Sequence, residues 1–253
     1  MAEPLNRSLA RGLNMLALLG ESKHGLELHE IAKVLDIPKS SAFNLLHTLL
    51  DMQFVEFKAS TSHYNLSMKM FEIGAKAVRR TNIDTVIREQ MQEIYLAMNE
   101  PVHCGVQDGT DVVYIDRIES TRSIRMTARI GFRIPLYCTA MGRAILACMP
   151  DSEVRELLKN QEFKRLTPYT VKNRDALIQE LAIVREQGYA IESQESNENV
   201  CCMGVAACDR EGVARYAISV SAPIFRMNDA TRKKCREHLL RAKETIERYL
   251  SII

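Results

Sequence analysis

Four polar side chains recur along one face of the stretch from 39 to 51. Ser40, Asn44, His47 and Asp51 follow one another at the spacing of a single α-helical face. Hydroxyl, amide and imidazole groups in that arrangement can hydrogen-bond to base edges in the major groove of DNA. A small helical hairpin with a solvated polar face would show the same pattern, so the neighbouring elements must decide between the two.

The segments around this helix predict a winged helix-turn-helix. A buried stripe at Ile31, Ala32 and Leu35 ends at the turn 36–38, which places a proline at the start of the next helix. Upstream, Ser8 is positioned to cap a helix that ends at Gly20. Downstream, two strand-like segments, 54–57 and 64–66, flank a polar tip. The predicted base-edge contacts are Ser40, Ser41, Asn44 and His47, and the predicted phosphate contacts are Arg11, Lys39 and Lys58.

Six stretches of the chain resemble the IclR family of bacterial transcriptional regulators. Three lie within residues 8–74: SLARGLNMLALL, LHEIAKVLDIPKSSAFNLLHTL and HYNLSMKMFEIG. Three follow residue 99: EPVHCGVQDGTDVVYIDRIES, GFRIPLYCTAMGRAILA and GYAIESQESNENVCCMGVA. The chain is similar to that family over nearly its whole length. The resemblance implies a DNA-binding regulator of a catabolic operon, with duplex operator DNA, a small carboxylate effector and a second copy of the chain (a homodimer or tetramer) as partners.

Composition is that of an ordinary globular protein. The 253 residues suit two domains, with 46% hydrophobic and 26% charged residues. There is no apolar run near the ~18 residues that cross a bilayer, and residues 1–12 lack the hydrophobic core of a signal peptide. We therefore expect a cytoplasmic protein. The net charge of +2 permits DNA binding without demanding it, since phosphate contacts depend on where the charges lie.

Beyond the hairpin the pattern predicts an α+β domain. We expect a winged helix-turn-helix over 1–66, a linker helix over 67–80 and an effector-binding and oligomerisation domain over 81–253. The sheet should carry helices on one face, and the resemblance implies the antiparallel sheet of a GAF-like sensor. The predicted strands are 102–107, 112–118, 123–130, 189–193, 201–208 and 213–221, and the predicted helices are 84–98, 139–149, 151–160, 173–187 and 228–250.

The segment 135–142 delivers a loop into a helix start, a place suited to an anion. Thr139 is positioned to cap the helix, and Ala140 and Gly142 leave backbone N–H groups accessible. On these residues alone, small side chains that let the helix pack on the sheet are the simpler explanation. The resemblance favours a ligand site, because IclR-type effector domains bind a small carboxylate there. The matching residues are Ile134, Ala140, Met141, Glu192, Cys202, Ser219 and Ser221.

The chemistry of these residues suits a hydroxy, keto or sugar acid. Ser219 and Ser221 are two apart on one strand and share a face. Glu192 would accept hydrogen bonds from ligand hydroxyls and would repel a second carboxylate. It stands where the family usually has Asp, as Asn199 replaces the usual Gly and Ala206 the usual Pro. Asn199 can still adopt the positive φ that Gly allows.

Two alternatives involve the seven cysteines, whose odd number and lack of a CxxC motif predict neither a disulfide framework nor a four-thiolate zinc site. An enzyme could use Cys202 as nucleophile, but neither His103 nor His238 lies in a Cys–His signature. A metal or redox sensor could use Cys201 and Cys202, or His103 and Cys104, yet Cys201 and Cys202 are adjacent on a strand and point to opposite faces. We expect no catalytic residues, no metal and no cofactor.

Overall fold

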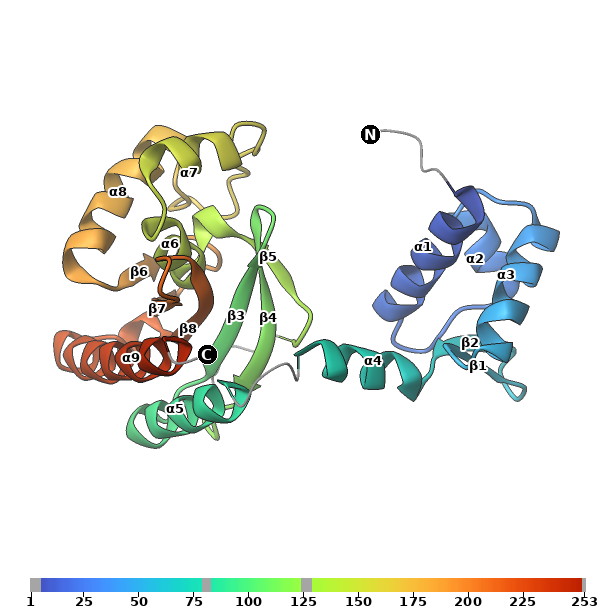
Figure 1. Cartoon of the computed structure of the whole chain (residues 1–253), viewed down its shortest axis with the longest axis horizontal. Helices are drawn as coiled ribbons and strands as arrows, with labels where there is room; N and C mark the ends of the chain where they lie inside the picture. The colour runs from blue at the N-terminus through green and yellow to red at the C-terminus, as the bar shows by residue number, and fades with distance from the viewer. Residues whose placement is uncertain (1–5, 79–82, 124–128, 252–253) are drawn as a thin grey trace. The chain divides into compact units, whose positions relative to one another are not determined.

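The chain divides into two compact units, Met1–Arg80 and Thr81–Ile253. A computed structural model describes residues 6–78, 83–123 and 129–251 (Figure 1). In the N-terminal unit, three helices and a two-stranded antiparallel hairpin enclose one small apolar core to which Ala42 and Leu46 contribute fully buried side chains. Its elements are α1 (Arg7–Glu21), α2 (Leu28–Val34), α3 (Lys39–Asp51), β1 (Val55–Lys58), β2 (His63–Leu66) and α4 (Met68–Val78).

The turn between α2 and α3 is set by two residues. Asp36 has a φ of 50°, which a short polar side chain tolerates better than an apolar one. Pro38 follows as the N-cap residue of α3 with a φ of −56°. Between them, the Ile37 N–H donates to the Ala32 carbonyl at 3.1 Å, which turns the isoleucine into the core. The two helices therefore meet at a fixed angle, as a helix-turn-helix requires.

The cap of α1 differs from the prediction. Asn6, and not Ser8, is the N-cap residue, and its Oδ1 accepts the Leu9 N–H at 2.9 Å. Asn and Ser are about equally good caps, so local preference did not separate the two positions, and the helix extends to the earlier one.

The C-terminal unit is built on one six-stranded sheet. Its strand order is β5-β4-β3-β8-β7-β6, and every neighbouring pair is antiparallel. The strands are β3 (Val102–Asp108), β4 (Asp111–Ile118), β5 (Arg133–Pro135), β6 (Ala190–Ser193), β7 (Val200–Cys208) and β8 (Ala214–Pro223). The helices are α5 (Ile83–Met98), η1 (Leu136–Cys138), α6 (Ala140–Ala147), α7 (Asp151–Leu157), α8 (Arg174–Gln187), η2 (Ile224–Arg226) and α9 (Asp229–Leu250).

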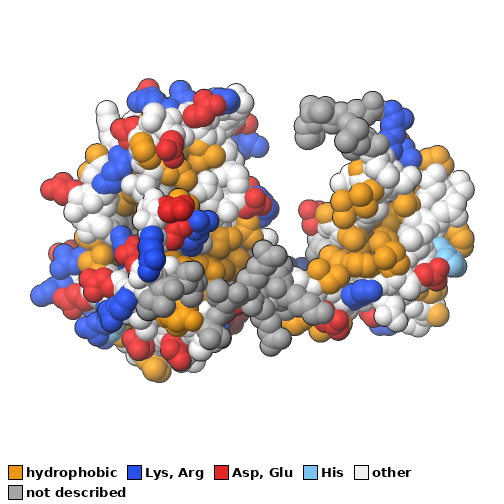
Figure 2. All heavy atoms as spheres, viewed as in Figure 1, with side chains coloured by type: hydrophobic (Ala, Val, Ile, Leu, Met, Phe, Trp, Pro, Cys, Tyr) orange, Lys and Arg blue, Asp and Glu red, His pale blue; other side chains and the backbone are white. Residues whose placement is uncertain are grey.

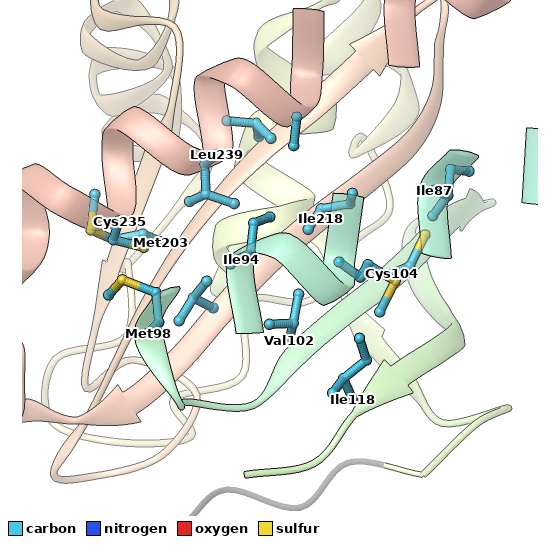
Figure 3. Close-up of a cluster of buried hydrophobic side chains, with 14 of the residues drawn as sticks. Ile87, Ile94, Met98, Val102, Cys104, Ile118, Met203, Ile218, Cys235 and Leu239 are labelled. Atoms are coloured by element: carbon cyan, nitrogen blue, oxygen red, sulfur yellow. The ribbon is translucent and has the colours of Figure 1, made fainter. Parts of the chain in front are cut away.

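Helices cover both faces of this sheet, which corrects the prediction of helices on one face (Figure 1). Along β7, Cys201, Met203 and Val205 pack with α5 and α9, in the cluster of Figure 3. The alternate residues Cys202 and Ala206 pack with α6, α7 and α8. The near-continuous apolar run of β7 is the pattern of a strand buried on both faces. Among the described residues, no helix has the length and apolar character needed to cross a membrane.

The predicted strand 123–130 falls largely on residues 124–128, which lie outside the described residues, and its flanking residues are not in a strand. A short strand was missed instead. β5 has three residues, too few to show an alternation, and it pairs with β4 through Ile134 opposite Val112. The other strands and helices of this unit lie where predicted, within a few residues at their ends.

Two glycines let α6 approach the rest of the unit closely. A Cβ on Gly142 would lie 2.1 Å from the Leu136 carbonyl oxygen, because η1 folds back under the first turn of α6. A Cβ on Gly204 would lie 3.1 Å from backbone atoms of Ala140 and Met141, because the helix start rests on β7. Gly142 is therefore small because it packs against the backbone of η1, whereas the simpler explanation had placed this packing at the sheet.

Gly142→Ala should destabilise the C-terminal unit by about 3 kcal/mol, the upper range for overpacking, since rigid backbone atoms must move. Gly12→Ala in α1 is the matched control, because its added methyl group meets nothing within 4 Å. That change should stabilise its own unit by up to about 1 kcal/mol through helix propensity. Urea unfolding of the full chain measures both. A Gly142→Ala variant as stable as the wild type would contradict the close packing.

Candidate nucleic-acid interface and ligand cavity

The exposed face of α3 carries most of the predicted base contacts. Lys39, Ser40, Asn44 and His47 are exposed, whereas Ser41 is half-buried and correspondingly less accessible. The His47 Nδ1 atom lies 3.1 Å from Asp51 Oδ2, between two exposed side chains. This pairing brings a carboxylate to the C-terminal end of the face, so the N-terminal half of α3 is the better suited to approach DNA.

Phe43 shares this exposed face and was missed by the sequence analysis. Half of its side chain is exposed (49%), and its ring centroid lies 6.1 Å from that of His47. An aromatic ring beside hydrogen-bonding groups can contact the methyl group of thymine. Its only signal in the sequence was its spacing, three residues after Ser40 and four before His47.

The predicted phosphate contacts are all exposed. Arg11 lies on α1, Lys39 begins α3, and Lys58 ends β1 beside the hairpin tip. Lys39 and Ser62 line the same surface hollow, together with Tyr64 and residues of α2. The start of α3 and the tip of the hairpin therefore border one surface, the arrangement in which a recognition helix and its wing can contact one duplex.

A cavity of about 400 Å³ lies on the α6 side of the sheet in the C-terminal unit. Three of the seven predicted ligand residues line it: Ile134, Cys202 and Ser221. The other four, Ala140, Met141, Glu192 and Ser219, are buried and do not line it. The remaining lining residues, which the sequence analysis did not identify, are His103, Tyr114, Arg129, Phe132, Ser196, Asn197 and Val200.

A chain of polar side chains crosses the cavity floor from strand to strand. Cys202 lies opposite Ser221 in the register of β7 and β8, and its thiol donates to the Ser221 hydroxyl at 3.1 Å. The same hydroxyl lies 3.5 Å from the His103 Nδ1 atom on β3. The His103 ring meets the Tyr114 ring edge-on at 5.3 Å between centroids. The floor thus combines hydroxyl, thiol and imidazole groups with an aromatic wall.

Glu192 is fully buried at the edge of this floor, opposite Cys202 in the β6–β7 register. Its Oε1 accepts the N–H groups of Glu195 and Ser196. Among the described residues its Oε2 has no hydrogen-bond partner. Burial raises the pKa of this carboxyl, while the N–H groups of Ser196 and Glu195, the neighbouring Cys202 side chain and the charge of Arg143 act in the opposite direction. An unpartnered buried oxygen costs free energy unless a ligand supplies a donor.

The start of α6 rests on Gly204, two residues along β7 from Cys202. Thr139 is the N-cap residue, as predicted, and its Oγ1 accepts the Gly142 N–H at 2.9 Å. The N–H groups of Ala140 and Met141 precede it and have no carbonyl in their own helix. Ser219 lies opposite Gly204, against which this helix start rests, so its place is beneath α6.

Arg143 anchors the loop that covers the cavity. This almost fully buried guanidinium pairs with Glu195 and with Glu180, 2.7 Å away, and also donates to the Tyr137 carbonyl. Glu195 in turn accepts the Val171 N–H at 3.1 Å. The ion pair between Arg143 and Glu195 therefore fixes the loop from 194 to 199 to α6.

Local backbone geometry shapes the same loop. Gln194 and Asn199 have positive φ angles, and the value of 63° at Asn199 agrees with the conformation that the sequence allowed. The sequence analysis did not identify Arg143 or Glu195, because helical spacing does not show which residues form an ion pair across the fold.

The chemistry of the adjacent cysteines argues against an enzyme built on Cys202 and against a sensor built on Cys201 and Cys202. Burial and the Glu192 carboxyl hold the pKa of the Cys202 thiol well above its usual value, so little nucleophilic thiolate is present. Cys201 and Cys202 lie on opposite faces of the sheet. Within the described ranges, no three residues of the metal-ligating types gather closely enough to hold an ion.

Comparisons with known proteins agree in both units. Residues 8–59 match the model of the IclR helix-turn-helix domain, and residues 75–248 match that of the bacterial transcriptional regulator IclR C-terminal domain. The HTH-type transcriptional regulator XynR of Escherichia coli (strain K12) is 32% identical over 247 residues, 98% of each chain. The regulator KdgR of Dickeya chrysanthemi is 33% identical over 222 residues, 88% of this chain and 72% of KdgR.

A solved structure extends this likeness to three dimensions. The crystal structure of the Thermotoga maritima IclR superposes with a TM-score of 0.80 at 30% identity, covering 96% of this chain and 98% of that one.

His103 should make stability depend on pH. Burial and the charge of Arg117 lower its pKa to about 4 from 6.5. The unfolded chain therefore takes up this proton first, and stability is lost as the pH falls from 6.5 towards 4. The difference between wild type and His103→Gln should change by about 3 kcal/mol over that range.

Urea unfolding of the full chain at successive pH values measures this difference. His238→Gln, at a partly exposed histidine in the same unit, is the control. Parallel pH profiles for wild type and His103→Gln would contradict a buried neutral imidazole.

Proposed function

This chain belongs to the IclR family of bacterial transcriptional regulators, and we propose that a small carboxylate metabolite in the C-terminal unit controls its binding to operator DNA. Like its relatives it is a regulator of transcription and not an enzyme. The observation that carries the ligand proposal is the unpartnered Oε2 of buried Glu192, beside a cavity of about 400 Å³. Since its other partner is chromosomal DNA, we place the protein in the cytoplasm.

We assign the DNA-binding winged helix-turn-helix to residues 1–66, a linker helix to 67–80, and effector binding and oligomerisation to 81–253. The division of the chain into two compact units and the ranges of the two family models support this assignment. The helix α4 occupies the linker segment.

In the proposed complex, the N-terminal half of α3 enters the major groove. Ser40, Asn44 and His47 hydrogen-bond to base edges, with half-buried Ser41 at the limit of reach, and Phe43 contacts a thymine methyl group. The exposure of these side chains on one helical face supports these roles. The phosphate contacts are Arg11, Lys39 and Lys58, which position the unit without reading sequence.

A second copy of the chain completes the proposed regulator. Apolar side chains gather on the N-terminal unit (Figure 2), and several are more than half exposed. Leu9 and Leu13 stand one turn apart on α1, and Met68 and Phe71 stand one turn apart on α4. Exposed apolar stripes of this kind support a protein–protein interface. A homodimer, or a tetramer built from two, would place recognition helices about one DNA turn apart.

The proposed effector is a hydroxy, keto or sugar acid. Its carboxylate would meet the N–H groups of Ala140 and Met141, where the helix dipole also favours negative charge. Its hydroxyl or keto oxygens would meet Glu192, Cys202 and Ser221 at the floor, near Ser219. Ile134 and Met141 supply apolar surface. An acid that serves as a carbon source makes a catabolic operon the proposed target.

The DNA assignment separates two kinds of contact. Binding sites are first selected from random duplex DNA with the full-length protein. Lys39→Ala should then weaken all sequences about equally and reduce the slope of log K against log salt by about 1. Asn44→Ala should cost about 1–3 kcal/mol at one base pair and relax the preference there.

Fluorescence anisotropy over a salt series measures both effects. Lys233→Ala, at an exposed lysine of α9, is the control and should leave binding unchanged. If Asn44→Ala retained the full sequence preference, α3 would not read bases through that residue.

The effector assignment is tested by thermal shift of the full-length protein against small hydroxy, keto and sugar acids. A ligand at one hundred times its Kd should stabilise the protein by about 2.7 kcal/mol. Glu192→Ala and Ser221→Ala should abolish the shift, because each removes a partner at the cavity floor. The acid that stabilises the protein should also change the affinity of the protein for the selected DNA.

Ser193→Ala is the matched control, since Ser193 follows Glu192 on β6 and points to the other face of the sheet. It should bind the acid as the wild type does. A shift that survives Glu192→Ala, or no shift with any acid of the panel, would refute this site.

A further inference from the structure

Two of the seven cysteines meet at the end of α6 opposite to its cavity end. Cys148 is the C-cap residue of α6, and Cys208 is the last residue of β7. They are 60 positions apart in the chain, yet their Sγ atoms lie 3.1 Å apart. A disulfide bond is about 2.05 Å long, so a movement of about 1 Å brings the two sulfurs to bonding distance.

A hollow of about 250 Å³ gives small solutes access to this thiol pair. Both cysteines line it and both are partly exposed. Lys243 and Arg185 line the same hollow, and Glu247 lies close by as the acceptor of the Cys208 N–H. By contrast, the cysteines other than these two and Cys202 are buried: Cys104, Cys138, Cys201 and Cys235.

The two sulfurs are not equivalent. The Cys208 thiol donates its hydrogen to the Cys148 Sγ atom. This hydrogen bond lowers the pKa of Cys148, as do the charges of Lys243 and Arg185, while burial and Glu247 oppose them. The same hydrogen bond and burial raise the pKa of Cys208. Cys148 is therefore the sulfur that carries thiolate character, and Cys208 is placed to attack it in turn.

We propose that Cys148 and Cys208 are a peroxide-sensitive pair that oxidises to a disulfide joining α6 to the end of β7. The Cys148 thiolate attacks one oxygen of hydrogen peroxide and becomes a sulfenic acid, and the other oxygen leaves as hydroxide. That hydroxide takes the Cys208 proton and becomes water. The Cys208 sulfur then attacks the Cys148 sulfur, and the sulfenic oxygen leaves as hydroxide and takes up the proton that Cys148 had released, which gives the second water. In sum, two thiols and one peroxide give one disulfide and two waters, with two electrons passing from sulfur to oxygen.

This bond would act on the helix that borders the cavity. The first turn of α6 already rests on Gly204 of β7, and the disulfide would join the last turn to the same strand. Helix and strand would then be held at both ends, in a compartment where disulfides are transient and signal oxidation. The inference is independent of which effector binds.

The full-length protein is treated with equimolar hydrogen peroxide, blocked with N-ethylmaleimide and mapped by mass spectrometry. The expected result is the loss of two alkylatable thiols and a cross-linked peptide that contains Cys148 and Cys208, reversed by dithiothreitol. Cys208→Ser should leave a sulfenic acid on Cys148 that dimedone traps, whereas Cys148→Ser should leave no dimedone adduct on Cys208.

Cys138→Ser, at a buried thiol of the same unit, is the control and should keep the cross-link. Mapping of the wild-type protein decides the proposal even if a serine variant fails to fold. The proposal is overturned if both cysteines remain alkylated after peroxide, if the disulfide links two protomers on a non-reducing gel, or if the dimedone adduct forms on Cys208 instead.

Discussion

The close approach of α6 to the sheet is the contact on which the C-terminal unit depends. Gly142 lets η1 pass beneath the first turn of the helix, and Gly204 lets that turn rest directly on β7. Backbone meets backbone at both places, so no side chain separates the helix start from the floor between β7 and β8. This approach brings the backbone of Ala140 and Met141 against Gly204, two residues along β7 from Cys202, which lines the cavity. With larger residues at these two positions, the helix start would be held away from β7.

Two buried carboxylates near this contact differ in their partners. Arg143 satisfies Glu195 and the carbonyls around it, so the loop over the cavity is held by a buried ion pair. Such pairs repay their desolvation only when their hydrogen bonds are complete. Glu192, a few residues away, keeps an oxygen without a partner among the described residues. Arg143 and Glu195 therefore hold the loop in place, whereas Glu192 is the carboxylate that we propose a ligand meets.

In the N-terminal unit, the candidate functional groups are exposed instead of buried. Its core is small, and its polar helix face and several large apolar side chains are left exposed. Exposed hydrogen-bonding groups on α3 suit bases, which offer complementary partners, and exposed apolar stripes suit another protein surface. The exposed apolar side chains are a cost for an isolated unit that a protein interface would offset, whereas water solvates the polar face of α3 until it meets DNA.

Local pattern predicted the elements, and the resemblance of six stretches indicated the family. The turn at Asp36 and Pro38, the cap at Thr139 and the stripes of α8 and α9 follow from spacing and residue type, because these are short-range preferences. The same pattern could not show that helices cover both faces of the sheet, since an apolar strand does not say what covers it. Nor could it choose Asn6 over Ser8, or detect a strand of three residues.

At the predicted site, the resemblance to the family supplied the residues near the helix start and on the last strands. Only the tertiary structure separated those that line the cavity (Cys202 and Ser221 among them) from those that support it, as Ser219 does. It also brought His103 and Arg143 to the site and Cys148 to Cys208, over separations of tens to more than a hundred residues. Contacts of that range depend on strand register and helix packing, which no local spacing encodes.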